Sequence, residues 1–178
     1  MSRAFVAVVP PAPVLDAVAG ALGEPEVAGA RFTRPEQWHL TLQFLGNQVE
    51  LDEVADALGQ LALRSGPVQL GGFGAFPNER RGRVLWLGVA EGAPLLAQLA
   101  AAVGVLLGPR GYPPEDRERH PHLTLARCKV PSDLRATVAA LGSGPVGPEW
   151  QVEDVVLYES LTRSTGAKFM ERGRFPLR

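Results

Sequence analysis

The sequence predicts an α+β protein in which one pattern of strands and helices occurs twice. The tetrapeptide HLTL stands at 39–42 and again at 122–125, and SGPV stands at 65–68 and again at 143–146. Both passes have the same order, namely strand, helix, HLTL strand, helix, SGPV turn and strand. The period of about 80 residues is too long for a solenoid repeat, and two copies do not form an array. We therefore expect an internal duplication in which each pass contributes a sheet with helices on one side.

The spacing of apolar residues distinguishes strands from helices in each pass. Runs of β-branched or alternating apolar residues predict strands, whereas apolar residues three and four positions apart predict helices. The predicted strands are 3–9, 38–45, 68–73, 83–89, 122–125, 152–159 and 169–175. The predicted helices are 14–22, 51–63, 94–107 and a stretch that begins at Ser132, a predicted N-cap, and runs to Leu141.

Length and composition bound the class of protein. The chain has 178 residues, of which 46% are apolar, so we expect a single bilobal domain, 1–178, with pseudo-repeats of approximately 1–80 and 81–178. The formal net charge of -1 excludes a globally basic nucleic-acid coat but permits a local basic cleft. The single cysteine, Cys128, excludes an internal disulfide framework. No segment is recognised as a signal peptide or membrane span, and we expect a cytoplasmic protein.

The two HLTL strands carry two of the three histidines of the chain. Residues two apart share a face of a strand, so His39, Thr41 and Gln43 are expected on one face of the first copy. The same alternation places His122 and Thr124 on one face of the second copy. The opposite face of the first copy would hold Leu40, Leu42 and Phe44, against the core. If the two passes are related by a pseudo-two-fold axis, both His-Thr pairs line one cleft.

This arrangement suits the hydrolysis of a phosphodiester. The reaction needs a base that takes a proton from water and an acid that protonates the departing oxygen. Histidine titrates near neutral pH, so one neutral and one protonated imidazole can divide these roles. A threonine hydroxyl can donate a hydrogen bond to a non-bridging phosphate oxygen as its charge grows. A single HLTL would indicate only a half-buried strand, but two copies at matching places favour a functional site.

A metal site is the competing interpretation. His120, His122 and Cys128 lie near one another in the sequence, but their spacing matches no familiar zinc motif. The glycine-rich stretch 71–74 lacks the lysine and the helix start of a phosphate-binding loop. The chain therefore suggests neither a metal nor ATP, and we expect no cofactor.

The paired motifs resemble those of a known family. Two HxTx motifs in a duplicated chain of this size are similar to the 2H phosphoesterases. The flanking RAFVAV, HLTLQFLG, RVLWLGV and HPHLTLAR are more closely similar to the RNA 2′,3′-cyclic phosphodiesterases, long labelled 2′-5′ RNA ligases. The resemblance implies a duplicated bilobal, LigT-like α+β fold. Such a fold has two mostly antiparallel sheets, with helices on their outer sides and a central cleft.

The resemblance also implies an activity. It implies metal-independent hydrolysis of RNA 2′,3′-cyclic phosphate ends to 2′-phosphates, with His39 as the proton donor and His122 as the proton acceptor. Thr41, Thr124 and Arg127 would bind the phosphate. The family can also join tRNA halves through a 2′-5′ bond without ATP. Strict alternation puts Arg127 on the leucine face, so the strand must bulge there or the side chain must reach around its end.

Contacts to the RNA beyond the phosphate are expected from arginines and aromatic residues in predicted loops, since such side chains hold and stack single-stranded nucleotides. The alternative is that these arginines are solvated loop charges and the aromatics satellites of the core. The candidates are Phe76, Arg80, Arg81, Arg83, Tyr112, Arg117 and Arg119. Trp38 and Trp86 lie within predicted strands and are expected to be structural.

The sequence thus predicts a monomeric RNA 2′,3′-cyclic phosphodiesterase that acts through His39 and His122. One alternative is a phosphodiesterase for a small cyclic nucleotide such as ADP-ribose 1″,2″-cyclic phosphate. Another is a non-catalytic protein that binds RNA ends in the same cleft. The paired histidines favour an enzyme, because binding needs only threonine and arginine.

Overall fold

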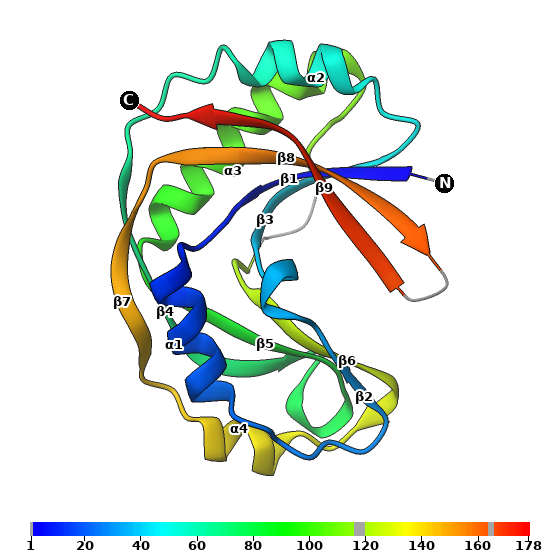
Figure 1. The fold of residues 1–178 in the computed structure, drawn as a ribbon, viewed down its shortest axis with the longest axis vertical. Helices are drawn as coiled ribbons and strands as arrows, with labels where there is room; N and C mark the ends of the chain where they lie inside the picture. The colour runs from blue at the N-terminus through cyan, green and yellow to red at the C-terminus, as the bar shows by residue number, and fades with distance from the viewer. Residues whose placement is uncertain (1, 116–119, 164–165) are drawn as a thin grey trace.

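The chain folds around one curled antiparallel sheet (Figure 1). The computed structural model describes residues 2–115, 120–163 and 166–178. Within these residues the sheet has nine strands in the order β7-β4-β5-β6-β3-β1-β8-β9, with β2 paired to β6. The strand bounds are β1 Ser2–Val8, β2 Ala30–Phe32, β3 Leu40–Asn47, β4 Gly66–Phe76, β5 Gly82–Glu91, β6 Leu123–Ser132, β7 Pro145–Val152, β8 Asp154–Arg163 and β9 Gly166–Pro176.

The two expected sheets are two halves of this single sheet. One half contains β3, β1, β8 and β9, and the other contains β7, β4, β5 and β6, with β2 at its side. They join where β3 meets β6, through the pair Leu40–Leu123. All of the described strand pairs are antiparallel, as expected.

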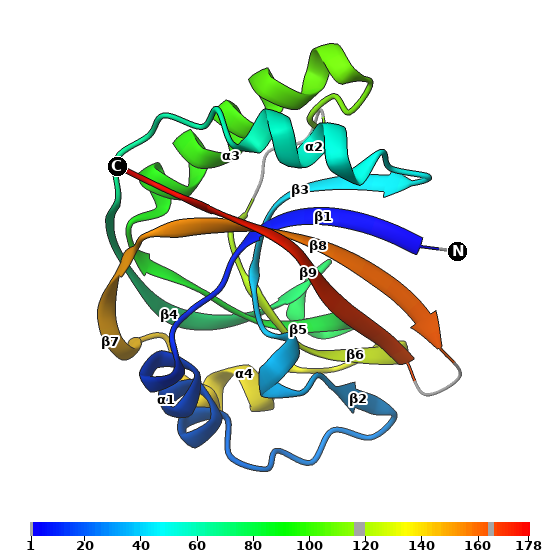
Figure 2. The ribbon, with the colours of Figure 1, turned by 45° about the horizontal axis from the view of Figure 1, so that its top comes forward.

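The helices cover the outer sides of the two halves. The helix bounds are α1 Ala12–Leu22, α2 Leu51–Leu58, α3 Ala93–Leu107 and α4 Arg135–Leu141, and the short 3-10 turns are η1 Pro35–Gln37, η2 Glu79–Arg81 and η3 Gly108–Arg110. Figure 2 shows α2 and α3 above the half with β3 and β1, and α1 and α4 below the half with β5 and β6. Contacts of α3 with β3 and of α1 with β7 agree with this view.

The two passes exchange elements between the halves. The SGPV segments do not only form turns, because they begin β4 and β7, which pair with each other from Gly66–Val152 to Gly71–Pro145. From there β4 continues beside β5 of the second pass. The chain of β7 continues as β8, which lies beside β1 of the first pass. The halves of the sheet therefore do not coincide with the two passes of the sequence.

Three expectations about the helices need correction. Ser132 is not an N-cap, because it ends β6 and its hydroxyl donates to the carbonyl of Val130, so that α4 begins later. The second helix ends at Leu58, where Gly59 follows. The stretch Ala93–Arg110 is long and apolar enough to cross a membrane by length and composition, contrary to expectation. Within the fold this stretch contains α3, which buries Leu96, Leu99, Val103, Gly104 and Leu107.

Candidate active site

The two HLTL strands meet at the join between the halves of the sheet. Leu40 pairs with Leu123, and each is no more than 1% exposed. Continuing this antiparallel register by one residue places His39 beside Thr124 and Thr41 beside His122. These four side chains lie on the face opposite the buried leucines, as alternation predicts. The two histidines are then diagonal neighbours on the sheet, and strand positions related in this way are roughly 7–8 Å apart.

Both imidazole rings are held in the same way. Nδ1 of His39 lies 2.7 Å from the carbonyl oxygen of Gln37, and Nδ1 of His122 lies 2.6 Å from that of His120. A carbonyl oxygen only accepts, so Nδ1 carries the proton and donates it in each ring. In the neutral imidazole, Nε2 is therefore the unprotonated nitrogen, on the side of the ring away from that carbonyl. The two motifs thus hold their histidines in the same tautomer.

Aromatic rings surround His39. Its ring stacks on Phe5 at a centroid distance of 4.6 Å and meets the edge of Phe169 at 5.3 Å, with Tyr158 farther away at 6.5 Å. This burial lowers the pKa of His39 from 6.5 to about 4. The hydrogen bond to the Gln37 carbonyl opposes the shift, while the positive charges of His122 and Arg127 add to it. His122 and Arg127 therefore lie close enough to His39 for their charges to oppose a proton on its ring.

A β-bulge turns Arg127 toward the histidines. Trp86 pairs with Thr124 and Leu85 with Ala126, so Leu125 is an extra residue in β6. After this bulge, Leu125 and Ala126 are both buried and Arg127 is exposed on the face of Thr124. Of the two arrangements left open for Arg127, the bulge is the one that occurs.

The first motif has a matching bulge, which makes one expectation wrong. Val6 pairs with Gln43 and Ala7 with Thr41, so Leu42 is the extra residue. Gln43 is fully buried instead of facing the cleft, and Phe44 is 52% exposed instead of facing the core. Phe44 thus follows His39 by the same step as Arg127 follows His122, and its ring lies 6.2 Å from Phe5.

Thr33 and Trp38 connect the two motifs, and no pattern in the sequence pointed to the role of Thr33. The hydroxyl of Thr33 lies 2.7 Å from the carbonyl oxygen of Thr124 and 2.9 Å from that of Leu125. It accepts a hydrogen bond of 2.9 Å from the indole Nε1 of Trp38, the residue before His39. The backbone N–H of Thr33 also donates to the Leu125 carbonyl at 2.8 Å. This chain of bonds fixes the bulge of β6 relative to the first histidine. Trp38 is 3% exposed, so its expected structural role is confirmed.

The structure places the residues that were predicted to contact RNA in different parts of the fold. Phe76 lies beside the second histidine, with its ring edge-on at a centroid distance of 4.9 Å from His122. Arg81 and Arg83 are exposed, and Nη1 of Arg83 donates to the Lys129 carbonyl at 3.3 Å. Arg80 is also exposed, and Arg117 and Arg119 lie outside the described residues.

Tyr112 lies away from the histidines. Its hydroxyl accepts a hydrogen bond of 3.0 Å from the backbone N–H of Glu50, and its ring packs against the core. Its carbonyl accepts one of 2.8 Å from the side-chain amide of Gln43. These contacts fit the alternative of a satellite core aromatic, and they tie the buried Gln43 to the segment that precedes the second motif.

The described residues do not assemble the competing metal site. Within 2–115, 120–163 and 166–178, no three histidine, cysteine, aspartate or glutamate side chains come together in a way that could hold a metal ion. Cys128 is buried at 7% exposure, while His120 is exposed ahead of β6, and its ring is tilted against that of Trp86 at a centroid distance of 4.7 Å.

Comparisons with known proteins show the family to which the chain is similar. A family model described as the 2′-5′ RNA ligase superfamily matches residues 12–163. A curated relative from Thermus thermophilus, named RNA 2′,3′-cyclic phosphodiesterase, is 40% identical over 154 residues, which are 81% of this chain and 74% of the relative. A relative of the same name from Aeropyrum pernix is 36% identical over 136 residues, which are 74% of this chain and 77% of the relative.

Solved structures give the same result for the fold. A crystal structure of a Thermus thermophilus protein has a TM-score of 0.79 at 29% identity, and the match covers 99% of this chain and 98% of that one. Apo Escherichia coli LigT also has a TM-score of 0.79, covering 99% of this chain and 97% of that one, and at 23% identity it supports the fold alone. The expected LigT-like α+β fold and the expected enzyme class both agree with these matches. With its paired HLTL motifs at one join of the sheet and a family match over most of its length, the chain belongs to the 2′-5′ RNA ligase superfamily.

Proposed function

We propose that this protein is an RNA 2′,3′-cyclic phosphodiesterase that uses His39 and His122 as its acid and base. The observation that carries the proposal is the matched setting of the two imidazoles. Each donates from Nδ1 to the carbonyl two residues before it, and each has a threonine on the neighbouring strand. One ring can therefore take a proton through Nε2 while the other gives one.

The hydrolysis is an in-line displacement at phosphorus. Water attacks the phosphorus opposite the 3′ oxygen, and Nε2 of His122 takes the proton that the water loses. The bond between phosphorus and the 3′ oxygen breaks, and His39 gives its Nε2 proton to that oxygen. The products are a 2′-phosphate and a free 3′-hydroxyl. Thr41 and Thr124 donate to the non-bridging oxygens, and Arg127 balances their charge.

Because the pKa of His39 is low, the bound substrate must raise the proton affinity of this imidazole. In the free cleft its pKa is about 4, so the ring is neutral at pH 7 and cannot act as an acid. A bound phosphodiester brings a negative charge beside the ring and offsets the positive charge of Arg127. Both effects favour the protonated imidazole. We infer that His39 gains its proton together with the substrate.

The same chemistry allows a ligation. If the 5′-hydroxyl of a second RNA takes the place of water, the displacement forms a 2′-5′ bond and needs no ATP, because the strained cyclic phosphate is the activated group. The family description, 2′-5′ RNA ligase superfamily, supports this extension, and tRNA halves are the substrates that we propose for it.

The activity is tested with an oligoribonucleotide that ends in a 2′,3′-cyclic phosphate. His39→Ala and His122→Ala should each lower kcat by at least about a hundredfold, the usual contribution of a general acid or base. His120→Ala is the matched control, since it removes the third imidazole but keeps the backbone carbonyl that holds His122. Full turnover by either of the first two variants would refute the mechanism.

The roles of the two histidines are separated by the leaving group. In a cyclic phosphate whose 3′ oxygen is replaced by sulfur, the leaving thiolate needs no proton from an acid. Turnover by His39→Ala should recover on this substrate, while turnover by His122→Ala should not. The reverse pattern would exchange the two roles.

A further inference from the structure

A cavity is lined by Trp86, whose ring centroid lies 6.4 Å from that of His122. Its volume is about 490 Å³, which is within the range of small-molecule sites. The HLTL residues do not line it, and the hydrolysis proposed above does not use it. Among its lining residues are Trp86 from β5, Asn78, Glu79 and Arg80 from the turn between β4 and β5, and Arg135 from α4. These side chains offer an aromatic surface, cationic donors and a carboxylate acceptor, which together suit a nucleotide.

Trp86 connects this cavity with the active site. It pairs with Thr124 across β5 and β6, so it lies on the face that carries the phosphate-binding threonine. Its ring is 5.1 Å from Phe76 and 4.7 Å from His120, and Phe76 in turn is 4.9 Å from His122. A continuous aromatic surface therefore leads from the second histidine to the cavity, and nucleobases stack on such surfaces.

The sequence keeps Trp86 flat against the sheet. Its cross-strand partner is Gly74, and a Cβ on that residue would collide with the indole ring. The indole Nε1 is buried and has no hydrogen-bond partner within the part of the chain that the structure describes. A buried N–H group without a hydrogen-bond partner lowers the stability of a fold, and such groups are uncommon in native proteins.

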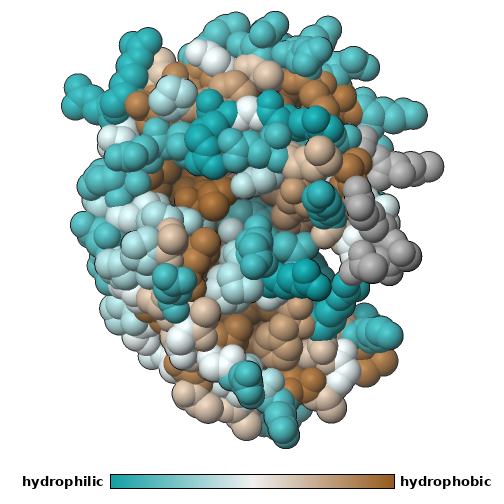
Figure 3. All heavy atoms as spheres, in the orientation of Figure 1, coloured by the Kyte–Doolittle hydropathy of each residue, from teal (hydrophilic) through white to brown (hydrophobic). Residues whose placement is uncertain are grey.

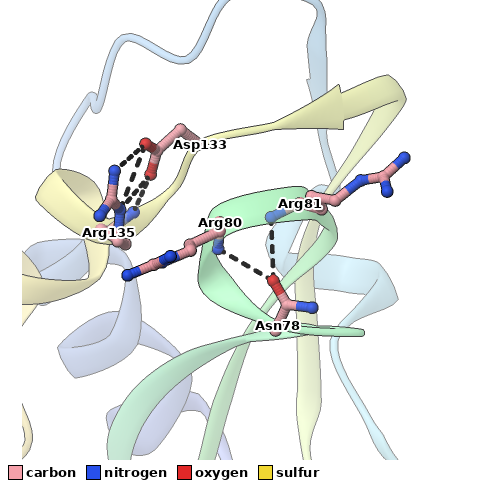
Figure 4. A network of polar contacts seen from close by, with 5 residues as sticks. All are labelled: Asn78, Arg80, Arg81, Asp133 and Arg135. Carbon is pink, nitrogen blue, oxygen red and sulfur yellow. Dashed lines mark hydrogen bonds and ion pairs between the residues drawn. The ribbon is translucent and has the colours of Figure 1, made fainter.

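Arg80 acts on the nearby Asp133 through its charge, and the hydrogen-bond donors of its guanidinium are available to a ligand. Arg135 is engaged by Asp133, with Nε at 3.0 Å from Oδ1 and Nη2 at 2.6 Å from Oδ2. Asn78 accepts from the backbone N–H groups of Arg80 and Arg81 at 3.1 Å and so fixes the turn between them. Figure 4 shows the Arg80 side chain extending toward the Asp133–Arg135 pair, while Arg81 points the opposite way. The guanidinium of Arg80 makes no hydrogen bond to any other described residue.

We propose that this cavity is a subsite for the nucleotide joined to the one that carries the cyclic phosphate, with Arg80 contacting the phosphodiester that links them. The base lies against Trp86, and Glu79 and the amide of Asn78 meet polar groups of the nucleoside. The subsite rests on the proposed phosphodiesterase function, because it extends the same RNA end across the aromatic surface. It predicts that the protein prefers an RNA chain over a mononucleotide.

The test compares a nucleoside 2′,3′-cyclic phosphate with a dinucleotide that ends in the same group. The wild-type protein should have a KM about tenfold lower for the dinucleotide, the effect of one charge-assisted hydrogen bond. Arg80→Gln should remove that difference and leave hydrolysis of the mononucleotide unchanged. Arg81→Gln removes the same charge from the next residue, whose side chain points away (Figure 4), and should keep the difference.

Salt dependence supplies a readout that a merely structural change would not alter. Loss of one phosphate contact should lower the slope of log KM against log salt by about 0.7 for the dinucleotide, and by nothing for the mononucleotide. Equal KM values for the two substrates in the wild type would overturn the subsite. Equal losses in Arg80→Gln and Arg81→Gln would overturn the role of Arg80.

Binding measurements separate a failure of the subsite from a failure of the proposed function. If the wild type hydrolyses neither substrate, the phosphodiesterase proposal fails. Titration with a dinucleotide 2′-phosphate and a nucleoside 2′-phosphate then still decides the subsite. Tighter binding of the dinucleotide that depends on Arg80 would support it, and equal binding of the two ligands would refute it.

Discussion

The hydroxyl of Thr33 should support both the stability and the activity of the protein. Thr33→Val keeps the shape of the side chain but removes the bonds to the carbonyls of Thr124 and Leu125, at 2.7 and 2.9 Å. It also leaves the indole N–H of Trp38, a side chain that is 3% exposed, without its acceptor at 2.9 Å. A lost hydrogen bond costs about 1 kcal/mol and an orphaned buried donor about 2 kcal/mol more, so we expect a loss of about 3 kcal/mol.

The loss is measured by thermal unfolding and by hydrolysis of a cyclic-phosphate RNA. For a chain of this size, about 3 kcal/mol corresponds to a fall in Tm of about 9 °C. The freed bulge should also misplace Thr124 and Arg127, lowering kcat/KM at least about tenfold. Thr33→Ser keeps the hydroxyl and is the matched control. If Val and Ser variants lost the same stability and the same activity, the link between the motifs would not depend on the hydroxyl.

A double-mutant cycle isolates the bond between the two side chains. Trp38→Phe removes the indole N–H, so Thr33→Val should cost about 2 kcal/mol less in that background. Additive losses would mean that the energy comes from packing of the methyl and ring groups instead.

Three further predictions concern other parts of the structure. Burial lowers the pKa of His39 from 6.5 to about 4, so between these pH values the unfolded chain binds more protons than the folded protein. The free energy of unfolding should therefore fall by at most about 3 kcal/mol as the pH drops from about 6.5 to 4. Chemical denaturation of His39→Gln at the same pH values should lack this part of the decline. Gly74→Ala would place a Cβ against the indole of Trp86, so we expect a loss of about 2 kcal/mol in denaturation and weaker RNA hydrolysis than in the wild type. Glu159 is 9% exposed and accepts from both Nε and Nη2 of Arg172, so Glu159→Gln should lower the midpoint of chemical denaturation by an amount equivalent to about 1–2 kcal/mol.

The sequence predicted which side chains lie beside the two histidines, but not where the strands depart from regular alternation. Alternation places His39 with Thr41 and His122 with Thr124, because the first three residues of each HLTL strand are regular. It fails at the next step, because an extra residue in each strand reverses the faces. The residues of the motif do not predict a bulge, because a bulge depends on how the neighbouring strand is paired. The predicted faces of Gln43 and Phe44 were wrong for this reason.

The sequence also did not predict which strands from distant parts of the chain pair with each other. The repeat indicated two copies of one pattern, and the strand and helix types follow from apolar spacing. The exchange of β4 and β8 between the halves leaves no trace in that spacing, because a buried strand has the same pattern beside either neighbour. Thr33 shows the same limit, since its importance arises only from carbonyls that are far away in the chain.

The exchange of β4 means that neither pass is complete as a folding unit. A chain cut at η2 would give two fragments with one HLTL histidine each, and each fragment would present strand edges that only the other covers. A single pass on its own would meet that need by pairing with an identical copy, with two equal HLTL strands across a two-fold axis. In such a symmetric dimer the two imidazoles would have the same surroundings and the same proton affinity. Joining the copies in one chain removes that constraint, and here Phe5, Tyr158 and Phe169 surround one histidine while Phe76 and Trp86 flank the other.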